Sequence, residues 1–184
     1  MGVRELIEQE ASPFESPVVL LNLSPVTYHQ GVLDTLRYFS ERFGTGLYIT
    51  LNKPCATLQV AFGKAGVPSE RVVYLDSITN TAEHDTESCR YLGRMRELTD
   101  ICVALTKLAS ERKVRFVLLD SVSTLLMYND TKSVARFCHA VAEKLRSMGL
   151  SGALVLVDMQ EGKDMAAQLS QFCDAYVKVG GGVG

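Results

Sequence analysis

The most constraining feature of the sequence is an almost unbroken apolar run that ends on an acid. Residues 114–119, VRFVLL, lead directly into Asp120, and Ser121 follows at once. A continuous apolar run of this length predicts a strand buried on both faces, as in the middle of a parallel sheet. The acid then stands at the carboxyl end of that strand, which is the edge where open α/β sheets bind ligands. Asp120 is therefore a candidate ligand-binding residue, and capping of the following turn is its alternative role.

Short apolar segments recur along the chain, and segments with helical spacing separate them. The predicted strands are residues 17–23, 46–51, 71–75, 114–119, 152–157 and 175–179. The predicted helices are residues 3–10, 26–43, 56–64, 90–112, 132–148 and 163–172. This alternation predicts an α/β fold, with a mainly parallel sheet, helices on both faces and right-handed crossovers.

Breaks in this pattern indicate the domain organisation. Residues 11–17 contain two prolines, so we expect residues 1–16 to form an N-terminal helix and linker and residues 17–184 to form one domain. Residues 77–88 are polar without an apolar period, and we expect them to form the most mobile loop. The closing sequence GGGVG, residues 180–184, is expected to hold no fixed structure.

Composition argues against several classes of function. With a formal net charge of −2 and no cluster of Lys and Arg, the chain lacks the basic field that holds nucleic acid. The longest apolar runs are far shorter than a membrane span and the N-terminus has no signal-peptide pattern, so we expect a cytoplasmic protein without a membrane partner. The five cysteines are widely spaced and form no CxxC motif, which argues against a disulfide framework and a zinc site.

The turn after the first predicted strand lacks the features of a phosphate-binding loop. Such a loop needs glycines that let backbone N–H groups approach the phosphates, a Lys for the terminal phosphates and a Ser or Thr for magnesium. Residues 23–31, LSPVTYHQG, contain no Lys, and Gly31 comes after the position of the tight turn. Pro25 also removes a backbone donor. This segment argues strongly against conventional binding of a nucleoside triphosphate.

Four stretches, in their order along the chain, resemble the RecA-like ATPases and in particular their KaiC-like branch. They are GLYITLNKP, RVVYLDS, VRFVLLDSVSTLL and FCDAYVKV. The resemblance extends from Pro17 to Val179. It implies a three-layer α/β/α fold with strand order 3-2-4-5-1-6, nucleotide at the carboxyl edge, and ring assemblies with nucleotide between subunits. Asp120 matches the magnesium-site aspartate of the family, and Ser121 matches the residue that usually follows it.

The departures from the family pattern concern catalysis. Counted from the first strand, the Lys of the family's phosphate loop falls near His29 and its Thr falls near Gln30. The catalytic acidic pair, usually two glutamates before a proline, falls on Asn52 and Lys53. Neither side chain acts as a carboxylate base toward water, and loss of one electrostatic element of such a site costs on the order of a hundredfold or more in rate. We therefore do not expect efficient ATP hydrolysis by the family mechanism.

If a nucleotide is bound, its contacts are assigned to Thr27, His29, Gln30, Lys53, Asp120 and Ser121, with Asp120 as the magnesium ligand. Structural roles compete with these assignments. His29 is mostly uncharged at neutral pH, and the alternative is an exposed residue at a helix start. Lys53 is a candidate contact to a phosphate or to a partner's carboxylate, or a solvated turn residue. Tyr28 and Tyr48 are candidates for stacking on a base, with core packing favoured for Tyr48.

Two further acids, Asp76 and Asp158, also end predicted strands. Together with Asp120 they would line one edge of the sheet and bind a cation without nucleotide. The alternative is a local role, because Asp at the end of a strand also forms turns.

Three functional hypotheses follow. The favoured one is a non-catalytic RecA/KaiC-like module, a regulatory or assembly subunit that binds itself or a RecA/KaiC-like homologue. The second is a protein that binds ATP or another phosphate ligand with Mg²⁺ through an altered loop and does not turn it over. The third is an ATPase that is completed by catalytic residues of a partner subunit.

Overall fold

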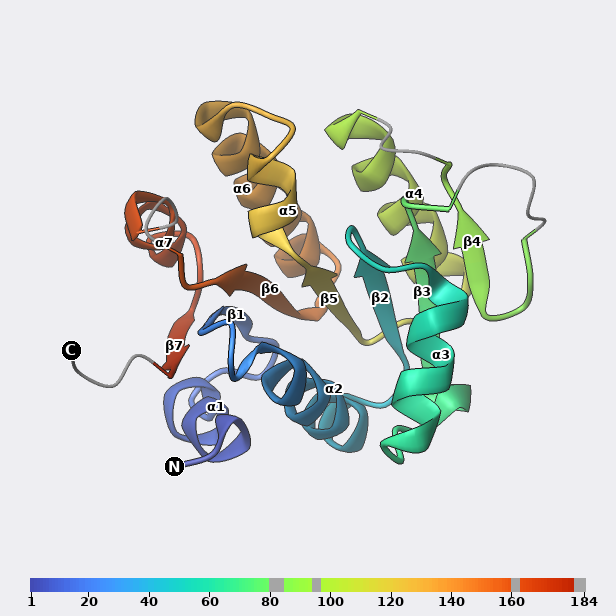
Figure 1. The fold of residues 1–184 in the computed structure, drawn as a ribbon, viewed down its shortest axis with the longest axis horizontal. Coiled ribbons are helices and arrows are strands. Elements are labelled where there is room, and N and C mark those ends of the chain that lie inside the picture. The colour runs from blue at the N-terminus through green and yellow to red at the C-terminus, as the bar shows by residue number, and fades with distance from the viewer. Residues whose placement is uncertain (80–84, 94–96, 160–162, 181–184) are drawn as a thin grey trace.

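A single parallel sheet forms the middle of the computed structural model, which describes residues 1–79, 85–93, 97–159 and 163–180 (Figure 1). Its strands are β1 (Val18–Leu23), β2 (Gly46–Thr50), β3 (Val72–Asp76), β4 (Cys89–Tyr91), β5 (Phe116–Asp120), β6 (Ser151–Val157) and β7 (Ala175–Val179). In the described residues these seven strands pair in the order β4-β3-β2-β5-β6-β1-β7, and every pairing is parallel. The six predicted strands therefore stand in the predicted order, and the α/β fold class is confirmed.

The short edge strand β4 is the difference from the predicted topology. The sequence predicts a helix from Arg90, and that start is wrong, since Cys89 to Tyr91 pairs with β3 and α4 (Leu98–Glu111) begins later. The apolar spacing of α4 continues backward past its start, but the open edge of β3 offers backbone partners. The backbone N–H of Tyr74 donates to Ser88 at 2.7 Å, and that of Leu92 donates to Asp76 at 2.8 Å. Pairing at a sheet edge thus overrides a local helical pattern.

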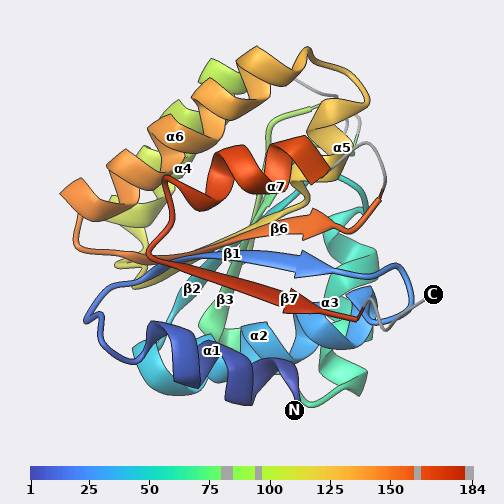
Figure 2. The ribbon, with the colours of Figure 1, turned by 90° about the vertical axis from the view of Figure 1, so that its left-hand side faces the viewer.

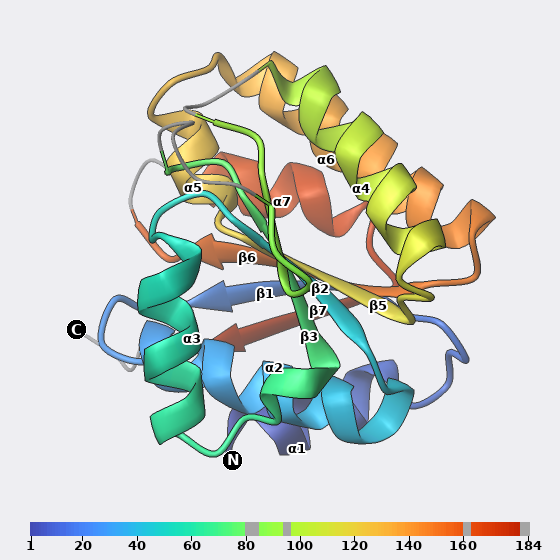
Figure 3. The same cartoon turned by 90° about the vertical axis from the view of Figure 1, so that its right-hand side faces the viewer.

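Two layers of helices cover the sheet (Figures 2 and 3). The remaining helices are α1 (Val3–Ala11), α2 (Tyr28–Phe43), α3 (Cys55–Lys64), a 3₁₀ turn (Ser69–Arg71), α5 (Val122–Leu126), α6 (Thr131–Ser147) and α7 (Lys163–Ser170). Helices α1 to α3 pack on one face with one apolar cluster, and α4 to α7 pack on the other face with a second cluster. None of the helices in the described ranges is long and apolar enough to cross a membrane.

The first helix is packed into the domain core. Val3, Ile7 and Ala11 recur at helical spacing and are buried, Ile7 and Ala11 completely. They belong to the same apolar cluster as β1 and β7, and α1 contacts both β7 and α2. The helix therefore packs against β7 on the face of the sheet that α2 also covers (Figure 2).

Gly180, the first residue of the closing tail, has a fixed place, so the expectation of no fixed structure is wrong for it. Its φ is +76°, and a Cβ there would collide with the side chain of Ser24. Only glycine combines this backbone conformation with so close an approach. The rest of the tail, residues 181–184, lies outside the described residues, as do residues 80–84 of the predicted mobile loop.

Candidate functional site

Asp120 ends the strand in the middle of the sheet. It stands between β2 and β6, in register with Thr50 and Val155. Its side chain is almost fully buried, with 2% of the residue exposed. An ionised carboxyl at such a depth needs hydrogen-bond donors, because burial without them is very costly.

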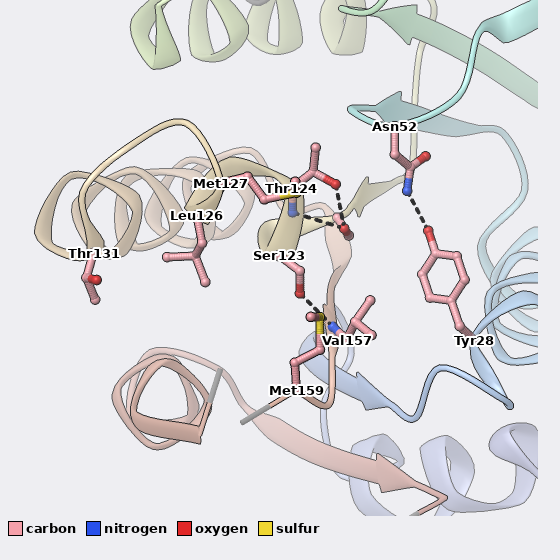
Figure 4. Close-up of a pocket in the computed structure, with 10 residues that line it drawn as sticks. Tyr28, Asn52, Ser123, Thr124, Leu126, Met127, Thr131, Val157 and Met159 are labelled. Atoms are coloured by element: carbon pink, nitrogen blue, oxygen red, sulfur yellow. Dashed lines mark hydrogen bonds between the residues drawn. The ribbon is translucent and has the colours of Figure 1, made fainter. Parts of the chain in front are cut away.

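Three side chains from other segments supply those donors. The phenol hydroxyl of Tyr28, the first residue of α2, donates to Oδ1 of Asp120, and the hydroxyl of Tyr48 on β2 donates to Oδ2. The amide of Asn52, just after β2, donates to Oδ1 at 3.4 Å and to the Tyr28 oxygen at 2.7 Å (Figure 4). Both carboxyl oxygens of Asp120 therefore have partners within the chain.

The electrostatics of this cluster are set by burial. Desolvation raises the pKa of Asp120 above its ordinary value, while the hydrogen bonds from Tyr28, Tyr48 and Asn52 act in the opposite direction. Burial and the nearby Asp120 charge raise the pKa of both phenols well above the ordinary value. The tyrosines accordingly remain protonated donors across the physiological pH range.

The short helix α5 follows directly, and its cap is Ser121. The Ser121 hydroxyl accepts from the backbone N–H of Thr124 at 3.4 Å and lies 3.0 Å from the Thr124 hydroxyl. The Ser123 hydroxyl accepts from the backbone N–H of Val157 at 2.8 Å and ties α5 to the end of β6 (Figure 4). Capping was the alternative role for Asp120, but the residue that caps α5 is its neighbour Ser121.

A cavity of about 580 Å³ opens beside this cluster at the carboxyl edge of the sheet. Its described lining is Tyr28, Asn52, Ser121, Ser123, Thr124, Leu126, Met127, Thr131, Val157 and Met159 (Figure 4). No lining residue in this described set carries a formal charge. The volume lies within the range of about 300–1,000 Å³ that is typical of small-molecule sites.

The turn at the position of a phosphate loop is closed by its own hydrogen bonds. The backbone N–H of Thr27 donates to the Ser24 carbonyl at 3.1 Å. The Thr27 hydroxyl lies 2.9 Å from the Ser24 hydroxyl and donates to the Val179 carbonyl at 3.1 Å. The segment is thereby attached to the end of β7, and its Thr27 hydroxyl is used within the fold.

Three of the other predicted nucleotide contacts lie on the surface. His29 and Gln30 are on the first turn of α2, where the Gln30 amide donates to Asp34 at 2.8 Å. Lys53 is exposed in the turn after β2, and its charge slightly counteracts the raised pKa of Asp120. Of the six predicted contacts, Ser121 lines the cavity, and Asp120 lies behind the two lining residues that donate to it.

The other two strand-end acids have separate partners. Asp76 is fully buried and accepts from the backbone N–H groups of Cys55, Ile78 and Thr79, each at 2.8 Å. It therefore closes the turn after β3 and satisfies the start of α3. Asp158 pairs with Lys178 at 3.0 Å. In the described ranges, no three His, Cys, Asp or Glu residues come together in a way that would hold a metal ion.

Sequence reasoning missed the joint role of Tyr28, Tyr48 and Asn52 around Asp120. Tyr48 is predicted as core packing, and it does pack against Phe62 and Tyr74. A buried tyrosine also needs a partner for its hydroxyl, and that need is the signal that points to a buried acceptor. The sequence does not indicate which acceptor it is.

Comparison with known proteins agrees with this architecture. The chain is similar to the KaiC-like protein PH0186 of the hyperthermophilic archaeon Pyrococcus horikoshii OT3, with a TM-score of 0.64 and 11% identity over 89% of this chain and 72% of that chain. It is also similar to the uncharacterized protein PH0321 of Pyrococcus horikoshii, solved in complex with an unknown peptide, with a TM-score of 0.70 and 13% identity over 100% of this chain and 86% of that chain. At such identities the likeness shows the fold alone, which is RecA-like and KaiC-like.

Sequence comparison places the chain in a family. No curated protein matches it. The model of a family of unknown function, DUF7504, matches residues 69–179, which is more than half of the chain and includes β3 to β7. The chain therefore belongs to the family of unknown function DUF7504.

Proposed function

We propose that this chain is a RecA-like module that does not hydrolyse ATP and acts as a regulatory or assembly subunit. Its partner would be a second copy of the chain or a RecA/KaiC-like homologue. The observation that carries the proposal is the covered carboxyl of Asp120. Tyr28 and Tyr48 donate to its two oxygens at the position where the family resemblance expects a magnesium ligand. Magnesium prefers oxygen ligands in near-ideal octahedral geometry, so an ion there would have to displace these donors.

Exposed apolar side chains at the same edge support the interaction role. Val26, in the turn after β1, is 93% exposed, and Met127 and Tyr128, after α5, are 75% and 65% exposed. Both segments follow the carboxyl ends of parallel strands and so lie at one edge of the sheet. Exposed apolar side chains along one edge of a fold are candidates for contact with a protein partner.

Calorimetric titration with ATP and ADP, with and without Mg²⁺, tests the proposal. We expect no heat of binding and no thermal stabilisation at millimolar nucleotide. Sedimentation equilibrium of the same preparation, alone and mixed with a purified RecA/KaiC-like homologue, should detect a complex of defined stoichiometry. The double variant Val26→Ser, Met127→Ser should weaken that complex at least tenfold, whereas the control Val60→Ser, Val103→Ser, which alters exposed valines on α3 and α4, should not. A chain that stays monomeric and binds no homologue contradicts the proposal.

A second candidate is nucleotide binding without turnover, and the cavity of about 580 Å³ at the carboxyl edge favours it. In that case Mg²⁺-dependent binding appears in the titration and is lost in Asp120→Ala. That outcome would overturn the non-catalytic interaction module as the primary function. Phosphate release that rises with complex formation would instead indicate an ATPase that is completed by its partner.

A further inference from the structure

A surface groove lies between α6 and α7, which pack against each other on one face of the sheet (Figure 2). Its volume is about 380 Å³, and its described lining is Lys132, Ala135, Arg136, His139, Gln168 and Phe172. Two of these residues carry a positive charge, a third gains one when it is protonated, and this described set contains no acid. The groove is therefore basic, although the chain as a whole has a formal net charge of −2.

The three basic residues of the groove lie along one stripe of α6. Arg136 follows Lys132 by four residues and His139 follows Arg136 by three, and all three are exposed. At about 1.5 Å of rise per residue, the stripe is about 10 Å long. The sequence has no run of Lys and Arg in this segment, so only the helical spacing gathers these side chains. Their charges are spread along a line rather than around a point.

The two permanent cations of the stripe have no acidic partner within the part of the chain that the structure describes. Glu143, the next acid along α6, lies 4.0 Å from His139 and 3.5 Å from Arg146. No described carboxylate of α6 or α7 lies within ion-pair distance of Lys132 or Arg136. Both charges are therefore available to a binding partner.

This arrangement opposes the stability of α6 as a helix. Lys132 is in the first turn, at the positive end of the helix dipole, and that turn contains no acid. The cap Asp130 accepts from the backbone N–H of Ser133 at 3.0 Å. Lys132 and Arg136 are like charges four residues apart, and such pairs are destabilising. Departures of this kind from the rules of stable folding are expected at functional sites, and a negatively charged partner would relieve both of them.

The remaining lining of the groove supplies an aromatic surface and an amide. The ring of Phe172, which follows α7, lies 4.6 Å from the ring of His139 between centroids, and this contact holds the imidazole at the groove. Gln168 on α7 is exposed, and its amide has no hydrogen-bond partner among the described residues. An amide both donates and accepts hydrogen bonds, which matches the alternating donors and acceptors of a peptide backbone.

We propose that this groove docks an acidic peptide segment of a partner protein. Carboxylates of the segment lie toward Lys132 and Arg136, and its backbone lies toward the amide of Gln168. The inference deepens the proposed function, on which it rests, by naming the chemistry of one contact surface. A line of charges about 10 Å long fits carboxylates that are spaced along a chain better than one compact anion. Nucleic acid is the competing ligand, and it is disfavoured because its binding draws on a wider basic field.

NMR titration of the full chain with hexa-L-glutamate tests this surface, with hexa-L-glutamine as the uncharged control peptide. We expect saturable shifts of the backbone amide signals around the groove with hexaglutamate, and none with hexaglutamine. Because the contact is between exposed charges, raising the salt from about 50 mM to about 500 mM should weaken binding at least tenfold.

A matched pair of double variants separates this groove from general charge attraction. Lys132→Gln, Arg136→Gln should weaken hexaglutamate binding at least tenfold. Lys64→Gln, Arg112→Gln makes the same change in net charge at exposed positions at the ends of α3 and α4, and should leave binding within twofold. No saturable binding, or an equal loss in both double variants, overturns the proposal. Tighter binding of hexathymidylate than of hexaglutamate would indicate a nucleic-acid surface and would also overturn it.

Thermal unfolding without peptide separates a binding role from a structural role. Since Lys132 and Arg136 repel each other, their double Gln variant should keep or raise the melting temperature. A lowered melting temperature with unchanged affinity for hexaglutamate would show that the two cations serve the fold, and would overturn their assignment. The peptide titration uses this chain alone. If hexaglutamate fails to bind while the complex with a second copy or a homologue forms, this inference fails and the proposed function stands; the reverse result contradicts the proposed function and supports the groove.

Discussion

At the scale of single residues, the molecule places a carboxyl group where its charge is difficult to maintain. Asp120 is buried at the end of the central strand and depends on two phenols and an amide for hydrogen bonds. The net effect of its surroundings is a raised pKa, with desolvation as the largest cause. A raised carboxyl pKa means that the folded chain holds its proton to a higher pH than the unfolded chain does.

This difference in proton binding between the folded and the unfolded chain predicts a pH-dependent effect of Asp120→Asn. The unfolded carboxyl titrates near pH ~3.9, so above about pH 4 the unfolded state binds fewer protons at this position than the folded state. The free energy of unfolding of the wild type, relative to Asp120→Asn, should therefore fall as the pH rises from about 4 toward neutrality. Urea denaturation of both proteins between about pH 4 and pH 7 measures this difference.

Asp130 provides a control of opposite sign. It caps α6, accepting from the backbone N–H of Ser133 at 3.0 Å, and hydrogen bonds from Ser133 lower its pKa. The stability that Asp130 contributes is present above the unfolded pKa and is lost as the pH falls through the folded pKa. Relative to Asp130→Asn, the wild type should therefore gain stability as the pH rises. If both aspartates gave the same sign, the electrostatic account of Asp120 would be wrong.

At the scale of elements, the close packing of β2 against β5 depends on one position that has no side chain. Gly46, the first residue of β2, is in register with Phe116 of β5, and a Cβ at Gly46 would overlap the Phe116 ring. That ring is fully buried and meets the edge of Phe39 from α2 at a centroid distance of 5.5 Å. Because Gly46 has no side chain, the Phe116 ring can pack between α2 and the sheet.

We expect Gly46→Ala to destabilise the protein by about 1–3 kcal/mol, because the ring has no free space to move into. The matched control is Gly63→Ala on α3, where no atom lies within 4 Å of the position that the new methyl group would take. That change should stabilise the fold by up to about 1 kcal/mol through helix propensity. Equilibrium denaturation of the two variants measures both effects, and an equal change in both would contradict the packing argument.

At the scale of the whole molecule, the first helix belongs to the body of the fold. It packs against the edge strand β7 and contacts α2, and Ile7 is fully buried in the cluster on that face. Residues that precede the predicted linker thus contribute directly to the stability of the sheet.

Truncation of Ile7 tests this contribution. Ile7→Ala should lower the free energy of unfolding by about 2–5 kcal/mol, as for an ordinary core residue. Leu6→Ala is the control, since Leu6 is half-buried on the same helix and should cost clearly less. Denaturant unfolding of the full chain gives both values. A cost at Ile7 no greater than at Leu6 would indicate that α1 is only loosely attached.

The sequence by itself determined the fold class, and its resemblance to the RecA-like ATPases implied the order of the main strands. Continuous apolar runs such as VVLLNL and FVLLD are characteristic of strands buried on both faces, and helical spacing between them leaves few topologies. The same local reasoning misplaced the start of α4 and left out β4. Edge pairing is a property of what lies beside a segment in space, and the apolar period of a segment does not encode it.

Only the tertiary structure decided the surroundings of the polar residues. The donors to Asp120 are 68 to 92 positions away along the chain, and the Lys178 partner of Asp158 stands on a different strand. In the sequence, Asn22 is a single polar residue in an apolar strand, and only the fold places residues of β7 and α7 beside it. Apolar burial is non-directional and follows composition and period, whereas hydrogen bonds and ion pairs require specific atoms at specific distances. Those distances exist only after the sheet has assembled.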